Sequence, residues 1–229
     1  MSPVAEGESP GAGICYERLY EYRFRQIPQP VRVQVWSEIS PYLAKRLGMP
    51  ERVLDAAAGR GEFINAVPAS ERWAVDVVDF HELHQDPGVK TVIGDVRTLE
   101  LPKDHFDGIL VSNLLEHLPT QDDVGSFLAK MRELLTVGGR IAVLGPNFRY
   151  CSREYFDCAD HTLALTHVSV EEHLYAAGFE IETVDARFLP YSFRSRLPTG
   201  RVGVRAYLRF PPAWRLLGKQ FLVIGRRGA

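Results

Sequence analysis

Short runs of hydrophobic residues alternate along the chain with longer stretches in which apolar positions recur at helical spacing. The short runs predict strands at about residues 52–56, 72–77, 90–94, 107–112, 139–144, 180–186 and 219–226. Strands that alternate with helices are typical of a mostly parallel sheet with helices on both faces. The pattern therefore predicts a Rossmann-like α/β fold around a seven-stranded sheet.

The organisation of the chain follows from the segments around these strands. Residues 14–48 are predicted to hold two helices, the second of them closed by Gly48. Residues 1–13 are rich in Gly, Ser, Pro and Glu without the basic and apolar regions of a secretory signal, so a disordered lead-in is expected. The remainder, 14–229, is predicted to be a single domain.

Capping residues indicate where two later helices begin and end. Thr120, followed three residues later by Asp123, predicts the start of a helix between the fourth and fifth strands, and the pair at 138–139 is expected to end it. Ser169 is predicted to cap the helix before the sixth strand. These helices separate the strands, as parallel neighbours require.

Composition and charge narrow the class of protein. The chain is 45% hydrophobic and 24% charged, with a formal net charge of -2, which argues against DNA binding through bulk positive charge. Three cysteines, an odd number at no zinc-ligand spacing, indicate a reducing compartment. No apolar stretch approaches the roughly 20 residues that span a bilayer. A cytoplasmic protein is expected.

Candidate chemistry begins at the run 53–64, where a buried strand breaks into a turn that contains Gly59 and Gly61. We predict that this turn opens a helix. In such a turn the backbone approaches a ligand closely and its amide groups face the ligand, as nucleotide-type cofactors require. The run therefore predicts a cofactor-binding domain.

The residues after this turn indicate the kind of cofactor. Asp76 ends the next predicted strand, where a carboxylate can accept hydrogen bonds from two ribose hydroxyls, and Asp79 is the substitute if that strand ends later. A dinucleotide site would carry Gly or Ala at the position of Ile64, so that helix and strand pack closely around a pyrophosphate. A nucleoside without phosphates is favoured.

A family resemblance rests on an ordered set of motifs. They are Asp55-x-Ala57-x-Gly59-x-Gly61, Asp76, Gly94-Asp95-Val96, the run 106–118 and the run 134–140. Over about residues 50–186 this set resembles class I S-adenosylmethionine-dependent methyltransferases, although Ala57 stands where that family usually has its first glycine. The resemblance implies a sheet whose last strand is antiparallel and S-adenosyl-L-methionine as the cofactor.

The resemblance also implies which residues hold the cofactor. They are Asp55, Ala57, Gly59, Gly61, Asp76, Asp95, Val96, Ser112 and Asn113. Asp55 would orient the methionine amino group, Asp76 would bind the ribose, and Asp95 with the next backbone amide would read the adenine edge. The backbone of the last two residues would flank the amino-acid part of the cofactor, because open α/β sheets bind ligands beyond the carboxyl ends of their strands.

The long connection at 145–168 is expected to line the acceptor side, because long connections in compact domains are usually functional. Asp160-His161 resembles an Asp-His pair that lies near the acceptor pocket in relatives. An imidazole oriented by a carboxylate is the arrangement of a general base, so His161 is the first candidate, with a purely structural role as the alternative. The other predicted residues of this connection are Tyr150, which would contact the acceptor, and His167, the second candidate base.

Glu116-His117 resembles a pair that lies beside diverse acceptors in this family, which indicates a positioning task, and His117 is the third candidate base. A metal would suit the side-chain types in the later connection. Their spacing matches no strong metal pattern, so no metal is predicted. The residues weighed as ligands are Asp157, Asp160, His161 and His167.

The segment 187–217 carries seven arginines interleaved with aromatic residues and no acid. This local charge predicts an anionic partner: a phosphate on the acceptor, an anionic membrane surface in peripheral contact, or RNA. Arg194 and Arg196 are predicted to bind the acceptor. The alternative is a solvated basic segment that covers the pocket or mediates a dimer.

The sequence predicts O-methylation of a hydroxyl on a saccharide or another small molecule that bears or is linked to phosphate, by a monomer or a homodimer. The aromatic and proline-containing parts of 187–217 resemble bacterial methyltransferases of glycan and natural-product pathways. Methylation of carbon or nitrogen on a small metabolite, RNA methylation, and a catalytically silent cofactor-binding module stay open as alternatives.

Overall fold

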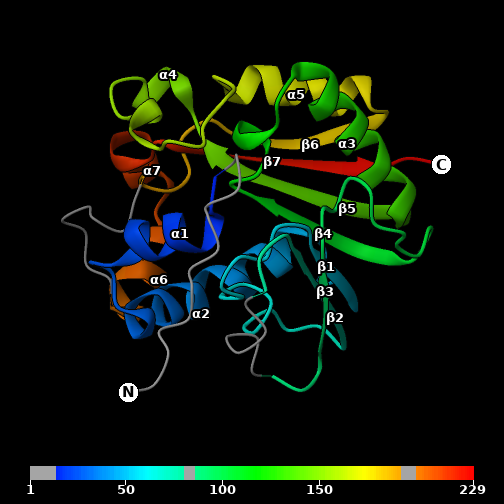
Figure 1. The fold of residues 1–229 in the computed structure, drawn as a ribbon, viewed down its shortest axis with the longest axis horizontal. Coiled ribbons are helices and arrows are strands. Elements are labelled where there is room, and N and C mark those ends of the chain that lie inside the picture. The colour runs from blue at the N-terminus through cyan, green and yellow to red at the C-terminus, as the bar shows by residue number, and fades with distance from the viewer. Residues whose placement is uncertain (1–13, 80–85, 192–199) are drawn as a thin grey trace, which may run out of the picture.

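The computed structural model describes residues 14–79, 86–191 and 200–229 (Figure 1). One seven-stranded sheet has the order β3-β2-β1-β4-β5-β7-β6. Its strands are β1 (Arg52–Asp55), β2 (Glu71–Asp76), β3 (Val89–Ile93), β4 (Phe106–Ser112), β5 (Leu135–Pro146), β6 (Phe179–Asp185) and β7 (Gln220–Arg227). Strands β1 to β5 pair in parallel, and β7 pairs antiparallel with both β5 and β6. The predicted fold class, with its antiparallel last strand, is confirmed.

Helices pack on both faces of this sheet. They are α1 (Tyr16–Phe24), α2 (Gln29–Arg46), α3 (Gln121–Leu134), α4 (Phe148–Cys151), α5 (His167–Ala176), α6 (Arg201–Arg209) and α7 (Pro211–Leu217), with short 3-10 turns η2 (Leu115–His117) and η3 (Tyr155–Asp157). Alternate residues of β4 point to opposite faces. Ile109 and Val111 pack with α3 and α5 in one hydrophobic cluster, and Leu110 packs with α2, α6 and α7 in the other.

The two helices predicted before β1 are present, and in the part of the chain that is described no helix is long and apolar enough to cross a bilayer. Helix α1 differs from the others because none of its nine residues is buried. It lies beyond the edge of the sheet at which β5 ends (Figure 1). The carboxyl ends of β1, β2, β4 and β5 share that edge because these strands are parallel.

The prediction that the glycine turn opens a helix was wrong. Residues 62–66 form successive turns, in which the amides of Asn65 and Val67 donate to the carbonyl oxygens of Gly61 and Phe63 at 3.0 and 2.9 Å. Pro68 follows at once and disfavours helical backbone in the residue before it. The segment is therefore too short to continue as a helix.

The helix between β4 and β5 begins as predicted but ends earlier. The Asp123 amide donates to Thr120 Oγ1 at 3.1 Å, which confirms the N-cap. Leu135 already has extended backbone and pairs with Phe106, so the glycine pair at 138–139 lies inside β5 and does not end the helix. Gly138 has φ +82°, which fits the register shift between β4 and β5.

The helix before β6 begins three residues earlier than predicted from Ser169. Thr166 is its N-cap, because Thr166 Oγ1 accepts from the Ser169 amide at 3.2 Å. Ser169 Oγ in turn accepts from the Thr166 amide at 2.9 Å. Ser169 is therefore the third helical residue of a reciprocal capping box, and its prediction as the cap itself was wrong.

Candidate active site

Asp55 is the last residue of β1 and is only 2% exposed. Within the described part of the chain its Oδ1 has no hydrogen-bond partner. Burial, and after it the charge of Asp76, raises the pKa of Asp55 to about 8. A buried carboxyl oxygen without a partner costs free energy, which a cationic ligand group would recover. The position therefore suits the amino group of an amino-acid moiety.

Asp76 ties the glycine turn to the end of β2. Its Oδ2 accepts from the Gly59 amide at 2.7 Å, and its Oδ1 accepts from the Val78 amide at 3.0 Å. Strand β2 ends at Asp76, whereas Asp79 is exposed beyond the strand, so the position expected for a ribose-binding carboxylate is that of Asp76. Each carboxylate oxygen has a second lone pair that a ribose hydroxyl could use.

The turn itself leaves room for a ligand. Gly59 and Gly61 have φ values of +51° and +75°, which favour glycine, and half-buried Ala57 replaces the glycine expected earlier in the turn. A Cβ added at Gly59 would meet no heavy atom of the described residues within 4 Å. The unpaired Asp55 oxygen, this open backbone and the Asp76 carboxylate fit an uncharged nucleoside joined to an amino acid.

The predicted adenine residues follow β3. Asp95 accepts from Arg97 Nη2 at 2.7 Å and from Arg97 Nε at 3.0 Å, and this guanidinium holds the pKa of Asp95 below its usual range. Val96 is buried at 5% exposure. Asp95 would therefore have to share its oxygens between Arg97 and an adenine amine.

Ser112 and Asn113 stand at the end of β4 as predicted. Asn113 has φ +50°, an uncommon conformation for a residue other than glycine. Its amide donates to the Leu144 carbonyl oxygen at 2.8 Å, and its Nδ2 donates to Ser112 Oγ at 3.0 Å. The chain thus turns sharply at the edge where the cofactor residues end, and such backbone strain is common at functional sites.

A compact polar cluster follows directly after this turn, in η2. Glu116 is 2% exposed, burial raises its pKa, and its Oε1 has no hydrogen-bond partner among the described residues. His117 Nε2 lies 3.9 Å from that oxygen. The ring of His161 meets the His117 ring edge-on, with 4.9 Å between centroids. We name these three residues the Glu116 cluster.

The Glu116 cluster joins two distant segments. The Glu116 carbonyl oxygen accepts from the Thr162 amide at 2.8 Å, which fastens the 145–168 connection to η2. Tyr155 packs its ring against His161 at 4.7 Å. From the sequence, Glu116 is predicted only as part of a positioning pair. Its place directly after an apolar strand could have indicated that its carboxyl group is buried.

The prediction that Asp160 orients His161 was wrong. The Asp160 carboxylate pairs with Arg23 of α1, and its Oδ2 lies 3.4 Å from His117 Nδ1. His161 Nδ1 is buried without a hydrogen-bond partner in the described structure, and burial lowers the pKa of His161 to about 4. Neighbours in a turn point in different directions, so the Asp-His pair in space is Asp160 with His117.

Helix α1 bridges the two parts of the site. Besides the ion pair of Arg23 with Asp160, burial and then the charges of Asp76 and Asp160 raise the pKa of Tyr20. Tyr20 therefore lies within electrostatic reach of both a cofactor-side and an acceptor-side carboxylate. Neither Arg23 nor Tyr20 could be identified from the sequence, because the pattern of a short helix without buried residues does not predict which part of the fold it contacts.

Tyr150 and His167 form a separate group. Asn147 Nδ2 lies 2.9 Å from His167 Nδ1 and donates to the Ala186 carbonyl oxygen at 2.8 Å. Tyr150 stacks on His167 at 6.4 Å, and the Arg187 guanidinium lies 4.8 Å from the Tyr150 ring. These contacts join the 145–168 connection to the end of β6 and not to the Glu116 cluster.

The arginine-rich segment is partly engaged with the protein itself. Arg201 and Arg205 pair with Glu38 of α2 at 2.9 and 2.8 Å. Arg187 donates to the carbonyl oxygens of Gly218 and Leu216. Because these arginines already have partners within the protein, the contacts weaken the prediction that the whole segment binds an anionic partner. Arg194 and Arg196 lie outside the described residues.

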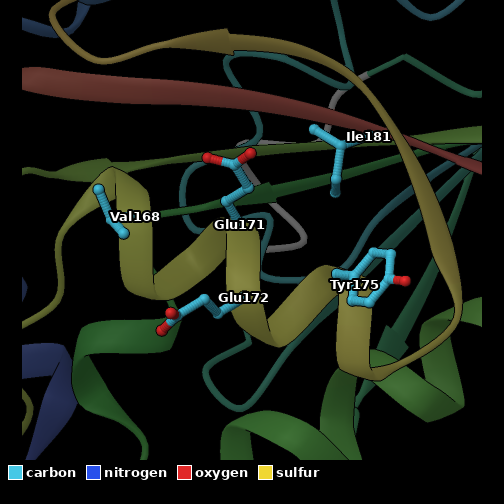
Figure 2. A pocket seen from close by; sticks show the side chains of 5 residues that line it. All are labelled: Val168, Glu171, Glu172, Tyr175 and Ile181. Atoms are coloured by element: carbon cyan, nitrogen blue, oxygen red, sulfur yellow. The ribbon is translucent and has the colours of Figure 1, made fainter.

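A shallow surface hollow of about 310 Å³ lies elsewhere, between α5 and β6 (Figure 2). It is lined by Val168, Glu171, Glu172, Tyr175 and Ile181. The carboxylates of Glu171 and Glu172 point in different directions, so they do not converge on a ligand (Figure 2). None of these residues is a candidate site residue.

The seven-stranded sheet with its antiparallel β7 is a fold that the chain shares with solved structures of S-adenosylmethionine-dependent methyltransferases. Residues 54–143 match the family model of a methyltransferase domain. The matched residues therefore form a methyltransferase domain, whose cofactor is S-adenosylmethionine. The matched residues run from within β1 to within β5 and include all the proposed cofactor residues and two of the three residues of the Glu116 cluster, Glu116 and His117.

Among solved structures, the chain is similar in fold to a SAM-dependent methyltransferase from Archaeoglobus fulgidus, with a TM-score of 0.64 and 19% identity over 92% of this chain and 99% of that one. It is equally similar to a possible histamine N-methyltransferase from Thermotoga maritima, with a TM-score of 0.64 and 16% identity over 93% of this chain and 96% of that one.

A curated relative is the probable non-canonical nonribosomal peptide synthetase CymA of Salinispora arenicola. It is 29% identical over 134 residues, which make up 52% of this chain. The match spans only 2% of the length of CymA. The similarity therefore concerns one small part of a much longer protein.

Proposed function

We propose that the protein transfers the methyl group of S-adenosylmethionine to a hydroxyl oxygen of a small molecule, such as a saccharide that bears or is linked to phosphate. A hydroxyl acceptor must be held in line with the sulfonium methyl and must lose its proton. The Glu116 cluster carries this proposal, because it gathers one carboxyl group and two imidazoles after β4, beside the proposed cofactor residues. A carbon or amine acceptor needs less assistance with proton removal.

The proposed cofactor residues are those at the ends of the first, second and fourth strands, as described above. On the acceptor side, Asp160 would act through His117, because the Asp160 carbonyl oxygen lies 2.9 Å from His117 Nδ1 and fixes that ring. His161 would face the acceptor directly. Tyr150 and His167 are proposed to contact a more distant part of the acceptor.

The acceptor would carry an anionic group for the arginines that stay available. Arg209 and Arg215 are exposed, beside the exposed apolar side chains Val202, Phe210 and Leu216. This combination supports an amphiphilic or lipid-linked acceptor, or peripheral contact with an anionic membrane from the cytoplasmic side. Binding to vesicles with and without anionic lipid tests it: equal, negligible binding to both removes the membrane part of the proposal.

The central test is a mass-spectrometric screen of purified protein with S-adenosylmethionine. Nucleotide sugars, lipid-linked saccharides and peptidyl natural products would be offered, the last because of the similarity to part of CymA. A product with one added methyl group on oxygen, formed with S-adenosylhomocysteine, supports the proposal. Methylation on nitrogen alone contradicts it and favours the activity in the name of the Thermotoga maritima neighbour.

Matched variants locate the chemistry. His161→Ala is expected to abolish turnover and to leave cofactor affinity intact, while His173→Ala, at a half-buried residue of α5 that contacts Gln121, leaves both unchanged. Cofactor binding in calorimetry, without methylation of any acceptor offered, would favour the catalytically silent cofactor-binding module. Salt-dependent RNA affinity in a shift assay would favour RNA methylation.

A further inference from the structure

We propose that the Glu116 cluster binds one divalent transition-metal ion of the Zn²⁺ type, with Glu116, His117 and His161 as its protein ligands. One ligand atom from each residue lies within 4.8 Å of the other two. Imidazole nitrogen and carboxylate oxygen are the donors that Zn²⁺, Fe²⁺ and Ni²⁺ accept in proteins. No residue of this set is used elsewhere in a salt bridge to Lys or Arg among those that the structure describes.

The spacing is that of a site slightly wider than a metal-bound one. Three atoms that are no more than 4.8 Å apart share a point within about 2.8 Å of each, whereas Zn²⁺ bonds to His nitrogen and carboxylate oxygen are about 2.0–2.2 Å long. Shifts of at most about 0.8 Å in each ligand atom would close this difference.

The tautomer of His117 is suited to metal binding. A carbonyl oxygen only accepts hydrogen bonds, so the 2.9 Å contact between His117 Nδ1 and the Asp160 carbonyl oxygen places the proton on Nδ1. Nε2 is then left with a lone pair, 3.9 Å from Glu116 Oε1. A ligand histidine that donates its other N–H to a backbone carbonyl is the usual outer-shell arrangement of metal sites.

The remaining two ligands point to an absent cation. Glu116 is 2% exposed, and neither its Oε1 nor the buried Nδ1 of His161 has a hydrogen-bond partner in the described part of the chain. Nearly all buried polar atoms in native proteins have a partner, and these two residues, whose ligand atoms lie within 4.8 Å of each other, need a common one. A single cation bound between them supplies it.

Three protein ligands leave a coordination position open, as in catalytic metal sites. The role of the ion rests on the proposed function: the acceptor hydroxyl binds the ion and releases its proton to water, because metal coordination lowers the pKa of bound oxygen. The resulting oxygen anion attacks the methyl carbon, the carbon–sulfur bond breaks, and its electron pair stays on sulfur in S-adenosylhomocysteine. Asp160 and Arg23 would position His117 from outside.

Metal binding is tested without reference to activity. Purified protein is freed of metal with a chelator and titrated with ZnCl₂ by calorimetry, and a CoCl₂-loaded sample is examined for visible absorption bands of the bound ion. We expect one equivalent bound. Glu116→Gln and His161→Gln should each weaken ZnCl₂ binding by more than the 10- to 100-fold that loss of an outer-shell partner costs.

His173→Gln serves as the matched control, because His173 lies on α5 and contacts Gln121. It should bind ZnCl₂ as the wild type does. The Co²⁺ spectrum of the wild type keeps the test independent of whether either cluster variant folds. Absence of a stoichiometric ion, or equal affinity in folded cluster variants and His173→Gln, would overturn the inference.

The two proposals fail in different ways. Methyl transfer to a hydroxyl by metal-free protein, undiminished by a chelator, leaves the proposed function standing and overturns the metal-bound acceptor. A bound ion in a protein that methylates no hydroxyl leaves the metal site standing and overturns the proposed function.

Discussion

Two edges of the site are built in different ways. We call the proposed cofactor residues at the ends of β1, β2 and β4 the cofactor edge, and the Glu116 cluster with Asp160 and Arg23 the acceptor edge. The cofactor edge joins Asp76 to Gly59, which are 17 residues apart, through a 2.7 Å hydrogen bond between the ends of adjacent strands. The acceptor edge joins His117 to Asp160 across 43 residues, and Asp160 to Arg23 across 137. Local backbone geometry determines the first, and the packing of remote segments determines the second.

This difference indicates how each edge responds to change. A substitution on the cofactor edge would remove a proposed direct contact to the cofactor and leave the rest of the site in place. On the acceptor edge, a substitution of Arg23 would act through another residue, since Arg23 pairs with Asp160, which lies beside His117. Four variants or conditions separate the two edges.

The largest effect is expected for Asp55→Asn. Loss of a buried charged partner costs about 3 kcal/mol, so cofactor affinity should fall on the order of 100-fold. The free energy of unfolding should stay the same or rise, because the variant no longer buries an ionisable group. Calorimetry and thermal unfolding measure both quantities.

Asp107→Asn is the control for this variant. Asp107 pairs with Arg52 near the opposite end of β4 and should matter for stability only. If Asp55→Asn binds the cofactor within about threefold of the wild-type affinity, a change of less than about 0.7 kcal/mol, Asp55 does not bind the cofactor.

Cofactor affinity should also depend on pH. Asp55 must lose its proton to pair with a cationic group, so affinity should fall by up to about tenfold for each pH unit below the pKa of about 8. Since the raised pKa makes the folded state bind this proton more tightly, the same group lowers the free energy of unfolding of the free protein as pH rises from about 4 to about 8. Titrations from pH 6 to pH 9 with Asp55→Asn in parallel check this, because the variant should give a flatter profile.

Arg23→Gln tests the acceptor edge. Removing the partner of the buried Asp160 carboxylate should cost about 1–2 kcal/mol, seen as a roughly tenfold lower kcat/KM for the acceptor. Cofactor affinity should change less than about twofold. Arg18→Gln, an exposed residue of the same helix, provides the comparison. A loss of cofactor affinity as large as the loss of kcat/KM would show that Arg23 supports cofactor binding as well as the acceptor side.

Glu38→Gln should have the smallest effect. Its partners Arg201 and Arg205 are 59% and 51% exposed, so loss of both pairs should lower the free energy of unfolding by no more than about 1 kcal/mol. Cofactor affinity and kcat/KM for the acceptor should stay unchanged. A changed kcat/KM for the acceptor, measured beside thermal unfolding, would reveal that α6 influences the site.

The cofactor edge could be predicted from sequence because its determinants are local. A strand end at Asp55, two glycines in a turn and a second strand end at Asp76 are visible within a short stretch of chain. The seven strands were predictable for the same reason, since buried strands are short apolar runs. The prediction that the glycine pair at 138–139 ends a helix was wrong because glycine suits both a helix end and a shift of register in a strand.

The acceptor edge could be predicted only in part. His117, Asp160 and His161 were candidates from their residue types, but the pairing of Asp160 depends on how the chain turns after Cys158 and on where α1 docks. Neither follows from spacing along the sequence. Arg23 could not be identified from the sequence, because its ion pair with Asp160 exists only in the folded arrangement.

Helix α1 contributes no buried side chain, yet Tyr20 and Arg23 reach both edges. Its attachment over the site therefore depends on polar and ring contacts and not on the hydrophobic core. Displacing it would break the ion pair to Asp160 without opening a cavity among the packed residues. Higher ionic strength, which weakens ion pairs, should therefore loosen the attachment of α1 while the hydrophobic core stays packed.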